Sequence, residues 1–417
     1  MLYKQVIHKI EESGLPVIVS VAHCLGGKYG GKAGNAGNHG IARHVYDLSS
    51  FLSDHYIFLT LIPINDRIVS IRILDSSFEL VFNVELEYKK LVRTLHQMRV
   101  TRIHYHHLMG IHPRIKQLAA DLGIAYDFTF HDYYTVCPQT QLCKDGIYCR
   151  EKGTSVCNSC PNKAEFIDID TWRDQSYQFL SQAGRLLAPS NDVKNRIANY
   201  YPDLKVTVLP HPELDNRVTE PDLPPLTPDR DMKILAMGHV AKNKGGYVAY
   251  ECSNDALIRN LPLSFRLLGR NIIGLVENAR LSLYGEYIND NAPNLIKEYD
   301  PDIIWFPALW PETFSYTLSL AMQTGIPIVS TDLGAFPERL RGYDAKIYIW
   351  ESQAYEINNL FMSCRTNLGH IRLRKPESPF SITDFFRVYD EEIKFNKIPP
   401  HLKSCFVGNS LNRVIQK

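Results

Sequence analysis

The 417-residue sequence has almost no excess of charge of either sign. Its 46 Lys and Arg residues are balanced by 45 Asp and Glu residues, which leaves a formal net charge of +1. Proteins that bind nucleic acid through their overall charge carry a clear basic excess, so we expect no nucleic-acid partner. A charged ligand must instead be bound by a local cluster of residues.

The sequence also lacks a long hydrophobic run. No segment approaches the roughly 18 apolar residues that a membrane-spanning helix needs. The N-terminal stretch "MLYKQVIHKIEESGLPVIVSVAHCL" does not have the order of a signal peptide, because acidic residues precede its apolar run. We therefore expect a cytoplasmic protein, and the sequence leaves open whether it associates peripherally with the inner face of a membrane.

We find no internal repeat and no long low-complexity tract. Hydrophobic residues make up 45% of the chain and charged residues 22%, which is typical of a globular protein with a full core. Apolar, β-branched runs predict buried strands, and helix-like segments lie between them, so we expect parallel α/β layers. The predicted strands are 15–23, 56–63, 100–107, 125–132, 184–190, 205–212, 232–239, 263–269, 302–308, 326–332 and 345–350. The predicted helices include 40–54, 86–98, 111–123 and 190–201, the last with Ser190 or Asn191 as its N-cap.

A polar segment with four prolines and no periodicity, residues 214–231, divides the chain. It predicts a linker between an N-terminal domain, 1–213, and a C-terminal domain, 232–385, with a final helix and tail over 386–417. Two α/β units joined by a short linker place a cleft between them. Ligands of open parallel sheets bind beyond the carboxyl ends of the strands, so we searched there for functional residues.

The stretch "MGHVAKNKGG" follows one predicted strand and opens a helix. Backbone N–H groups of the turn at Gly238 and Gly245, together with Lys244, suit a diphosphate. A glycine turn beside a surface lysine is also common without any ligand, so this stretch alone does not decide between the two.

The stretch "WPETFSYTLSLAMQTG" follows another predicted strand. Pro311 and Thr313 suit the start of a helix, and Gly325 suits its end. N–H groups from Phe314 to Tyr316 would then face the strand ends and again suit phosphate. Glu312 could accept hydrogen bonds from sugar hydroxyls, or it could be an acid favoured only by the helix dipole.

Together, "FTFHDYYTVCP", "APSNDVKNRIANYYP", "GHVAKNKGG" and "WPETFSYTLSLAMQTGIPIVSTDLGAFPERL" resemble the nucleotide-sugar-dependent glycosyltransferases of family 4. The resemblance is strongest to a bacterial subgroup that builds surface polysaccharide, and it covers nearly the whole chain in order. It implies an α/β fold of the GT-B type, with two Rossmann-like domains facing a central cleft. It also implies a donor held mainly by the C-terminal domain, transfer without a catalytic metal or other cofactor, and a final helix that crosses back to the N-terminal domain.

The resemblance assigns roles to the donor side. Glu312 matches the first acid of the family's Glu, seven residues, Glu pattern, which contacts the donor sugar. The second acid of the family pattern binds the ribose. Its position, about 12 Å further along a helix, is occupied here by Leu320. Lys244 matches the lysine of the diphosphate pair, and His239 occupies the position of its arginine. The implied donor site comprises Gly238, His239, Lys244, Gly245, Thr313, Phe314, Ser315, Tyr316 and the position of Leu320.

The resemblance places His131 in the cleft near the reacting sugar, beside Glu312. An imidazole there could bond a hydroxyl or stabilise charge on the departing phosphate, whereas a core histidine bonded to backbone is the structural alternative. On the acceptor side we expect the glycine-rich loop after the first strand and residues near it: Gly26, Gly27, Gly40, Arg43, His106 and His107. Arg43 and His44 also suit a solvated helix face. The group of His104, His106, His107 and His112 shows no acid and no regular helical spacing that would support a metal site.

Five of the nine cysteines lie within residues 137–160. A cytoplasmic location disfavours disulfides, and a C-x-x-C pair with two further thiolates suits structural zinc. The resemblance indicates Cys137, Cys149, Cys157 and Cys160 as the zinc set, with Cys143 outside it. A disulfide or redox pair and free structural thiols remain as alternatives.

From these residues we expect a retaining glycosyltransferase of the hexosyl type. It would move a sugar from a nucleoside-diphosphate sugar to a hydroxyl of a glycan or lipid-linked glycan. The departures at Leu320 and His239 leave a second hypothesis, a non-catalytic GT-B partner of an active transferase. A GT-B phosphorylase or epimerase is the third, and the stretch "WPETFSYTLS" speaks against it.

Overall fold

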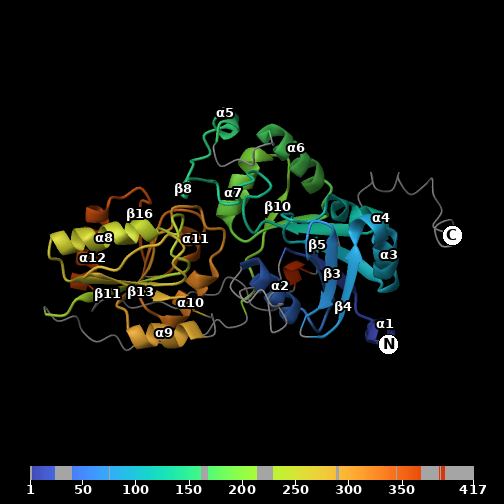
Figure 1. The fold of residues 1–417 in the computed structure, drawn as a ribbon, viewed down its shortest axis with the longest axis horizontal. Helices are drawn as coiled ribbons and strands as arrows, with labels where there is room; N and C mark the ends of the chain where they lie inside the picture. The colour runs from blue at the N-terminus through green and yellow to red at the C-terminus, as the bar shows by residue number, and fades with distance from the viewer. Residues whose placement is uncertain are drawn as a thin grey trace.

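The computed structural model describes residues 2–23, 40–74, 76–160, 168–213, 229–287, 291–343, 345–367, 385 and 387–389. Two lobes lie side by side, each built on its own β-sheet (Figure 1). One lobe holds the N-terminal strands, and the other holds the strands that follow the linker region. None of the helices in the described ranges is long and apolar enough to cross a membrane.

The N-terminal sheet has the strand order β10-β9-β6-β5-β1-β2-β3-β4. Its central strands are buried on both faces, because helices cover the sheet and the residues are mostly β-branched or aromatic. The strands are β1 (Val17–Val21), β2 (Ile57–Pro63), β3 (Ile68–Ile73), β4 (Glu79–Asn83), β5 (Val100–Tyr105), β6 (Ala125–Thr129), β9 (Arg185–Ala188) and β10 (Val206–Val208).

All six strands predicted for this half are present, and each pairs in parallel. The prediction of a parallel layer is wrong at one edge, where β3 pairs antiparallel with β2 and β4 pairs antiparallel with β3. Only four residues, 64–67, separate β2 from β3. A parallel crossover needs a dozen residues or more, so this connection has to reverse the chain as a hairpin.

The helices of this half pack on the sheet through amphipathic faces. Ser190 is the N-cap of its helix, as predicted, and its side chain accepts a hydrogen bond from Val193 N. The elements are α1 (Leu2–Ser13), α2 (Gly40–Phe51), α3 (Val84–Gln97), the 3-10 helix η2 (Pro113–Gln117), α4 (Leu118–Leu122), α5 (Thr154–Asn158), α6 (Ile169–Leu180) and α7 (Asn191–Tyr200). A two-stranded hairpin, β7 (Cys143–Lys144) and β8 (Ile147–Tyr148), lies in the cysteine-rich loop.

The second sheet is parallel throughout, with the order β13-β12-β11-β14-β15-β16. Its strands are β11 (Met232–Met237), β12 (Leu263–Leu268), β13 (Leu281–Gly285), β14 (Ile303–Phe306), β15 (Ile328–Thr331) and β16 (Lys346–Tyr348). Its helices are α8 (Gly246–Ile258), α9 (Ala292–Tyr299), α10 (Tyr316–Thr324), α11 (Phe336–Arg339) and α12 (Ala354–Asn367).

The start of α10 differs from the expectation. The helix begins at Tyr316, with Ser315 as its N-cap, rather than at Pro311 or Thr313. Residues 311–314 stay outside the helix because Glu312 O accepts a hydrogen bond from Ala335 N at 2.7 Å. Gly325 ends the helix in a left-handed conformation, as predicted.

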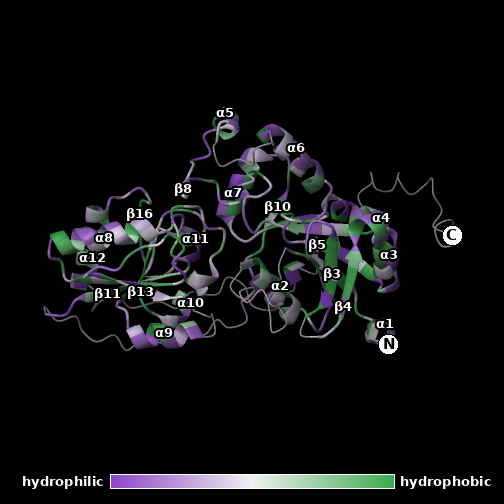
Figure 2. Ribbon diagram, in the orientation of Figure 1, coloured by the Kyte–Doolittle hydropathy of each residue, from purple (hydrophilic) through white to green (hydrophobic). Residues whose placement is uncertain are grey.

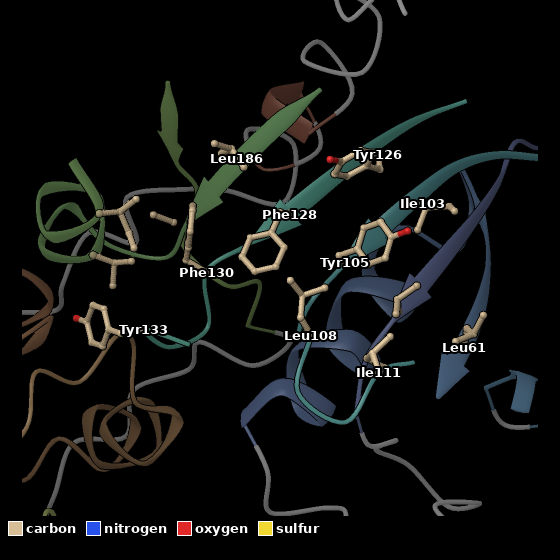
Figure 3. Packing of buried hydrophobic residues seen from close by; sticks show 14 of the residues in the cluster. Leu61, Ile103, Tyr105, Leu108, Ile111, Tyr126, Phe128, Phe130, Tyr133 and Leu186 are labelled. Atoms are coloured by element: carbon tan, nitrogen blue, oxygen red, sulfur yellow. The ribbon is translucent and has the colours of Figure 1, made fainter. Parts of the chain in front are cut away.

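Hydrophobic residues are concentrated on the strands, whereas helices such as α9 carry both hydrophobic and hydrophilic residues (Figure 2). Aromatic rings interlock in the N-terminal core, where Tyr105 meets Tyr126 edge-on at a centroid distance of 5.3 Å. Figure 3 shows Phe128 and Phe130 on the same layer, next to Leu186. This rigid layer fixes the strand ends that form the cavity described below.

A segment near the C-terminus packs against the N-terminal lobe. Phe385 and Tyr389 lie in one hydrophobic cluster with residues of β1, α2 and β2, and Figure 1 shows this short helical piece beside α2. Tyr389 O accepts a hydrogen bond from Arg185 Nη1 at 2.6 Å. Residues 390–417 of the predicted helix and tail, and 214–228 of the predicted linker, lie outside the described residues.

Candidate active site

The order of strands places a ligand site in each sheet. The chain runs from β1 to β2 on one side and later returns to β5 on the other side of β1. In the second sheet it runs from β11 to β12 and returns to β14 across β11. A crevice opens beyond the carboxyl ends of strands at such a switch point, and here both crevices open into one cavity.

The cavity has a volume of about 350 Å³. Most of its lining residues follow directly after strands, and they come from both halves of the chain. They are His23, Gly40, Ile41, Arg43, Met109, His131, Asp132, Thr140, Gln141 and His211 from the N-terminal half, and Gly238, His239, Lys244, Gly269, Arg270, Glu286, Tyr287, Trp310, Glu312, Thr313, Phe314, Ser315, Tyr316 and Thr317 from the C-terminal half.

Lys244 and Glu312 form the charged centre of the C-terminal wall. Lys244 Nζ pairs with Glu312 Oε1, and Trp310 Nε1 donates to the same oxygen at 2.9 Å. Glu312 is only 5% exposed, so its carboxylate is held in one position by these two donors. The remaining oxygen, Oε2, is available to accept a hydrogen bond from a hydroxyl in the cavity.

The N-terminus of α10 lies beside this pair. Tyr316 and Thr317 line the cavity, and the first N–H groups of a helix have no acceptor within the helix. Arg339 Nη1 donates to Phe314 O and to Ser315 O, each at 2.8 Å, which fixes the turn before the helix. A helix N-terminus and a lysine together suit an anionic group such as a diphosphate.

Glycines let the backbone of this wall come close to its neighbours. Gly245, at φ +79°, lies directly against the backbone of Pro307, where a Cβ atom would collide with the carbonyl group. This close approach brings the turn that carries Lys244 against the loop that carries Glu312. Gly245 therefore supports the wall and does not itself line the cavity.

The N-terminal wall is built from histidines. His131 follows β6, is 9% exposed and lines the cavity, while His106, which follows β5, is fully buried behind it. His106 Nδ1 and His131 Nε2 lie 3.2 Å apart. His211 stacks between His44 and Phe314, at ring distances of 4.1 and 4.6 Å.

Burial keeps these imidazoles neutral. It lowers the pKa of His44 to about 3 and holds the pKa of His131 well below its ordinary value, in both cases mainly because water is excluded. His131 therefore contributes a neutral ring, able to donate or accept one hydrogen bond at each nitrogen according to its tautomer. It does not supply a fixed positive charge to the cavity.

Thr313 joins the two walls. Its Oγ1 donates to His131 O at 2.7 Å, and its own carbonyl oxygen accepts from Ser190 Oγ at 3.0 Å. A further tie joins α7 to α11, where Asn191 Nδ2 donates to Glu338 Oε1 at 2.7 Å. The loop after β14 thus positions Glu312 relative to His131.

The structure brings most of the predicted site residues together. Eleven of them line the cavity: Gly40, Arg43, His131, Gly238, His239, Lys244, Glu312, Thr313, Phe314, Ser315 and Tyr316. Gly26 and Gly27 lie outside the described residues. Which of these residues act on a ligand stays a prediction.

Besides Gly245, three predicted residues lie away from the cavity surface. Leu320 packs against the hydrophobic core because α10 turns its side chain inward, so this position is not part of the lining. His106 is fully buried, and His107 Nε2 donates to Asp132 Oδ2 at 2.9 Å. The expectation of a solvated face at His44 is wrong, because that ring is only 4% exposed.

Sequence reasoning missed several lining residues. Arg270 follows the predicted strand 263–269, so the strand-end rule could have found it. Glu286 and Tyr287 follow β13, which the sequence analysis did not identify. His211 sits at the end of a predicted strand but carried no motif.

The cysteine-rich loop forms hydrogen bonds with the C-terminal half of the chain. Tyr148 N donates to Leu309 O at 2.7 Å, and Asn243 Nδ2 donates to Gln141 Oε1 at 2.8 Å. Burial, together with the smaller effect of the neighbouring thiols of Cys149, Cys157 and Cys160, raises the pKa of Cys137 to about 12. The four cysteines thus share one region, and zinc binding by them stays a prediction.

No family model matches the sequence, and no curated protein is similar to it. Among solved structures, HepE of Anabaena in complex with UDP and glucose has a TM-score of 0.55 at 13% identity, covering 91% of this chain and 99% of that chain. A glycosyltransferase from Rickettsia africae has a TM-score of 0.53 at 15% identity, covering 91% and 99%. Sucrose-phosphate synthase from Thermosynechococcus elongatus has a TM-score of 0.52 at 12% identity, covering 94% and 100%. The chain has the fold of these proteins, GT-B, with two Rossmann-like domains facing a central cleft.

Proposed function

We propose that this chain is a nucleotide-sugar glycosyltransferase that transfers a sugar, with retention, to a hydroxyl of a glycan or lipid-linked glycan. The observation that carries the proposal is the C-terminal wall of the cavity. There Lys244, Glu312 and the N-terminus of α10 meet at a switch point, facing His131 across the cavity. Membership of glycosyltransferase family 4 and a role in bacterial surface polysaccharide are part of the proposal.

The proposed donor lies mainly on the domain formed by residues 232–385. Its diphosphate takes the position between the N-terminus of α10 and Lys244, because both carry positive charge. Lys244 then exchanges its contact with Glu312 for one with phosphate. Solved structures of the same fold contain UDP and glucose or UDP-glucose, so uridine donors are the first to test.

Glu312 holds the donor sugar in this proposal, through Oε2 and a sugar hydroxyl. His131 lies opposite, where its neutral ring can donate a hydrogen bond to a hydroxyl or to the departing phosphate. We assign no protein group as nucleophile or general base. For the acceptor we propose the side of Arg43 and Gly40, which line the cavity at the start of α2.

The first test is calorimetric titration of the protein with UDP, GDP and ADP and with their sugar conjugates. We expect binding of one of these classes. If none of the nucleotides binds, the alternative of a non-catalytic partner of another transferase is supported instead. That alternative rests on Leu320, which stands where the resemblance implies a ribose-binding acid.

Lys244→Met should weaken nucleotide binding by about 10- to 150-fold, because a hydrogen bond to a charged group contributes about 1.5–3 kcal/mol. Lys233→Met is the matched control. Lys233 lies on β11, the strand that precedes the turn with Lys244; it is similarly exposed (35% against 29%) and donates to Tyr299 O away from the cavity. Equal affinities in the two variants would remove Lys244 from the donor site.

Glu312→Gln should lower the rate of sugar transfer by at least about 100-fold, as is found when a preorganised polar contact to the reacting group is lost. The amide keeps the volume and can still accept from Trp310 Nε1. The melting temperature should therefore change little. Transfer at the wild-type rate would show that Glu312 does not act on the donor sugar.

A further inference from the structure

Three buried imidazoles meet behind the N-terminal wall of the cavity. His44 comes from α2, His106 follows β5 and His131 follows β6. Each offers one ring nitrogen, and these three atoms lie within 4.8 Å of one another. All three rings are at least nine-tenths buried.

Two of these histidines have nitrogen atoms without a partner. Among the described residues, neither Nδ1 nor Nε2 of His44 has a hydrogen-bond partner, and the same holds for Nε2 of His106. A buried polar atom left unpaired costs about 1–3 kcal/mol. Three such atoms in one small volume form a costly arrangement unless something else binds there.

Neighbouring histidines show the contrast. His104 is satisfied at both nitrogens, by Thr129 Oγ1 at 2.7 Å and by Tyr389 OH at 3.2 Å. His107 is satisfied as well, by Asp132 Oδ2 and by Met109 N, each at 2.9 Å. Among the described residues, the fold therefore pairs both ring nitrogens of His104 and His107, whereas His44 has neither nitrogen paired and one nitrogen each of His106 and His211 is also without a partner.

We propose that His44, His106 and His131 bind one transition-metal cation of the zinc class. Neutral imidazoles are good ligands for such cations, with metal–nitrogen distances of about 2.0–2.1 Å. Tetrahedral coordination then separates two ligand nitrogens by about 3.3 Å. His106 Nδ1 and His131 Nε2, which form a hydrogen-bonded pair at 3.2 Å, already lie at this separation, and one of the two unpaired nitrogens of His44 supplies the third ligand.

The cation would hold His131 in place rather than take part in the transfer. His131 lines the cavity, and its carbonyl oxygen accepts from Thr313 of the opposite wall. Three protein ligands leave a fourth position, which water can fill. This site is separate from the four cysteines of the loop 137–160 and requires no thiolate.

Cobalt distinguishes the two sites, because only thiolate ligands produce sulfur-to-cobalt charge-transfer absorption in the near ultraviolet. The experiment uses the full chain carrying Cys157→Ser and Cys160→Ser, freed of metal with a chelator and titrated with Co²⁺. We expect one equivalent to bind, with visible d–d bands of a site with nitrogen and oxygen ligands and no charge-transfer band. Absence of binding would overturn the proposal.

His44→Leu in the same background tests the ligand. The change should weaken cobalt binding at least about 100-fold. Even the loss of a residue that only hydrogen-bonds a metal ligand lowers metal affinity about 10- to 100-fold. Unchanged binding would overturn the proposal. Leucine removes the unpaired nitrogens, so the metal-free variant should fold, which circular dichroism checks.

A second measurement keeps the test valid if His44→Leu folds poorly. His44→Gln retains polarity at the position, and Zn²⁺ should raise the melting temperature of the parent chain but not that of this variant. An equal rise in both would show that zinc binds elsewhere. Neither readout depends on enzymatic activity, so the outcome is separate from that of the proposed function.

Discussion

The two walls of the cavity are built on different principles. The C-terminal wall uses short contiguous stretches, in which glycines bring backbone segments together and a lysine meets a glutamate. The N-terminal wall uses buried rings from positions far apart in the sequence, such as His44, His131 and His211. One wall depends on backbone geometry and the other on side-chain packing.

This difference decides how each wall responds to change. Backbone contacts at a left-handed glycine tolerate no side chain, so single substitutions there should have large effects. In a packed cluster of ionisable groups, the stabilising free energy is divided among many contacts, and it changes with the protonation state of the groups. The predictions below test these two expectations in order of decreasing effect.

Gly245→Ala should be the most damaging change. A Cβ atom at this residue would collide with the carbonyl group of Pro307, and the backbone is at φ +79°. Overpacking costs about 1–3 kcal/mol, and a left-handed conformation adds about 1–2 kcal/mol for a residue with a Cβ atom. We expect a loss of about 2–5 kcal/mol in urea unfolding, together with loss of nucleotide binding.

Gly274→Ala is the control for that experiment. Gly274 has a similar φ of +68°, but no atom lies within 4 Å of the added Cβ position. The Gly274→Ala variant should lose only the conformational part of the free energy of unfolding, about 1–2 kcal/mol, and should still bind nucleotide. Equal losses at the two glycines would mean that the contact with Pro307 is unimportant and that the C-terminal wall does not depend on close backbone approach.

The same difference explains what the sequence could predict. Strands read from apolar runs were correct in both halves, because burial on two faces leaves a local signal. Lys244 and Glu312 could be found because they follow those strands within a few residues. No local sequence signal predicts that His44 meets His106 and His131. The three rings come together only because the order of the strands places β5 and β6 side by side and α2 packs next to their ends.

Local signals also failed where tertiary contacts override them. Pro311 and Thr313 are good helix-start residues, yet the helix starts after Ser315 because the chain is held against Ala335. The antiparallel strands β3 and β4 and the outer strand β13 were missed. These strands are partly exposed, so their sequences alternate between apolar and polar residues or are largely polar. They therefore lack the continuous apolar run from which the other strands were predicted.

Asp47→Asn tests the buried ionisable groups of the N-terminal half. Burial raises the pKa of Asp47 to about 6, although Arg43 Nε donates to it at 2.6 Å. The folded state therefore binds more protons than the unfolded state between about pH 4 and 6. The contribution of Asp47 to stability falls as the pH rises through this window, and it stays low above pH 6.

Asparagine removes this titration. The free energy of unfolding of Asp47→Asn, relative to wild type, should increase by up to about 3 kcal/mol between pH 4 and pH 7, since each unit of pKa shift corresponds to 1.36 kcal/mol. Urea unfolding at both values measures it. A difference between Asp47→Asn and wild type that does not change with pH would show that the carboxyl of Asp47 is not perturbed.

Tyr389→Phe should have the smallest effect, because it removes one hydroxyl from a well-packed region. The hydroxyl pairs with His104 Nδ1 at 3.2 Å, whereas the ring stays against Phe385 and beneath the Arg185 guanidinium. We expect a loss of about 1–2 kcal/mol in the free energy of unfolding, from one hydrogen bond and the unpaired nitrogen. Tyr355→Phe, at a tyrosine 53% exposed whose hydroxyl lies 3.3 Å from Glu356 Oε1, should leave stability unchanged. If Tyr389→Phe also had no effect, the C-terminal segment would be held by ring packing and by the hydrogen bond from Arg185 Nη1 to Tyr389 O. The buried hydroxyl contact in the N-terminal half would then contribute less to stability than the polar contacts around Glu312 in the C-terminal half.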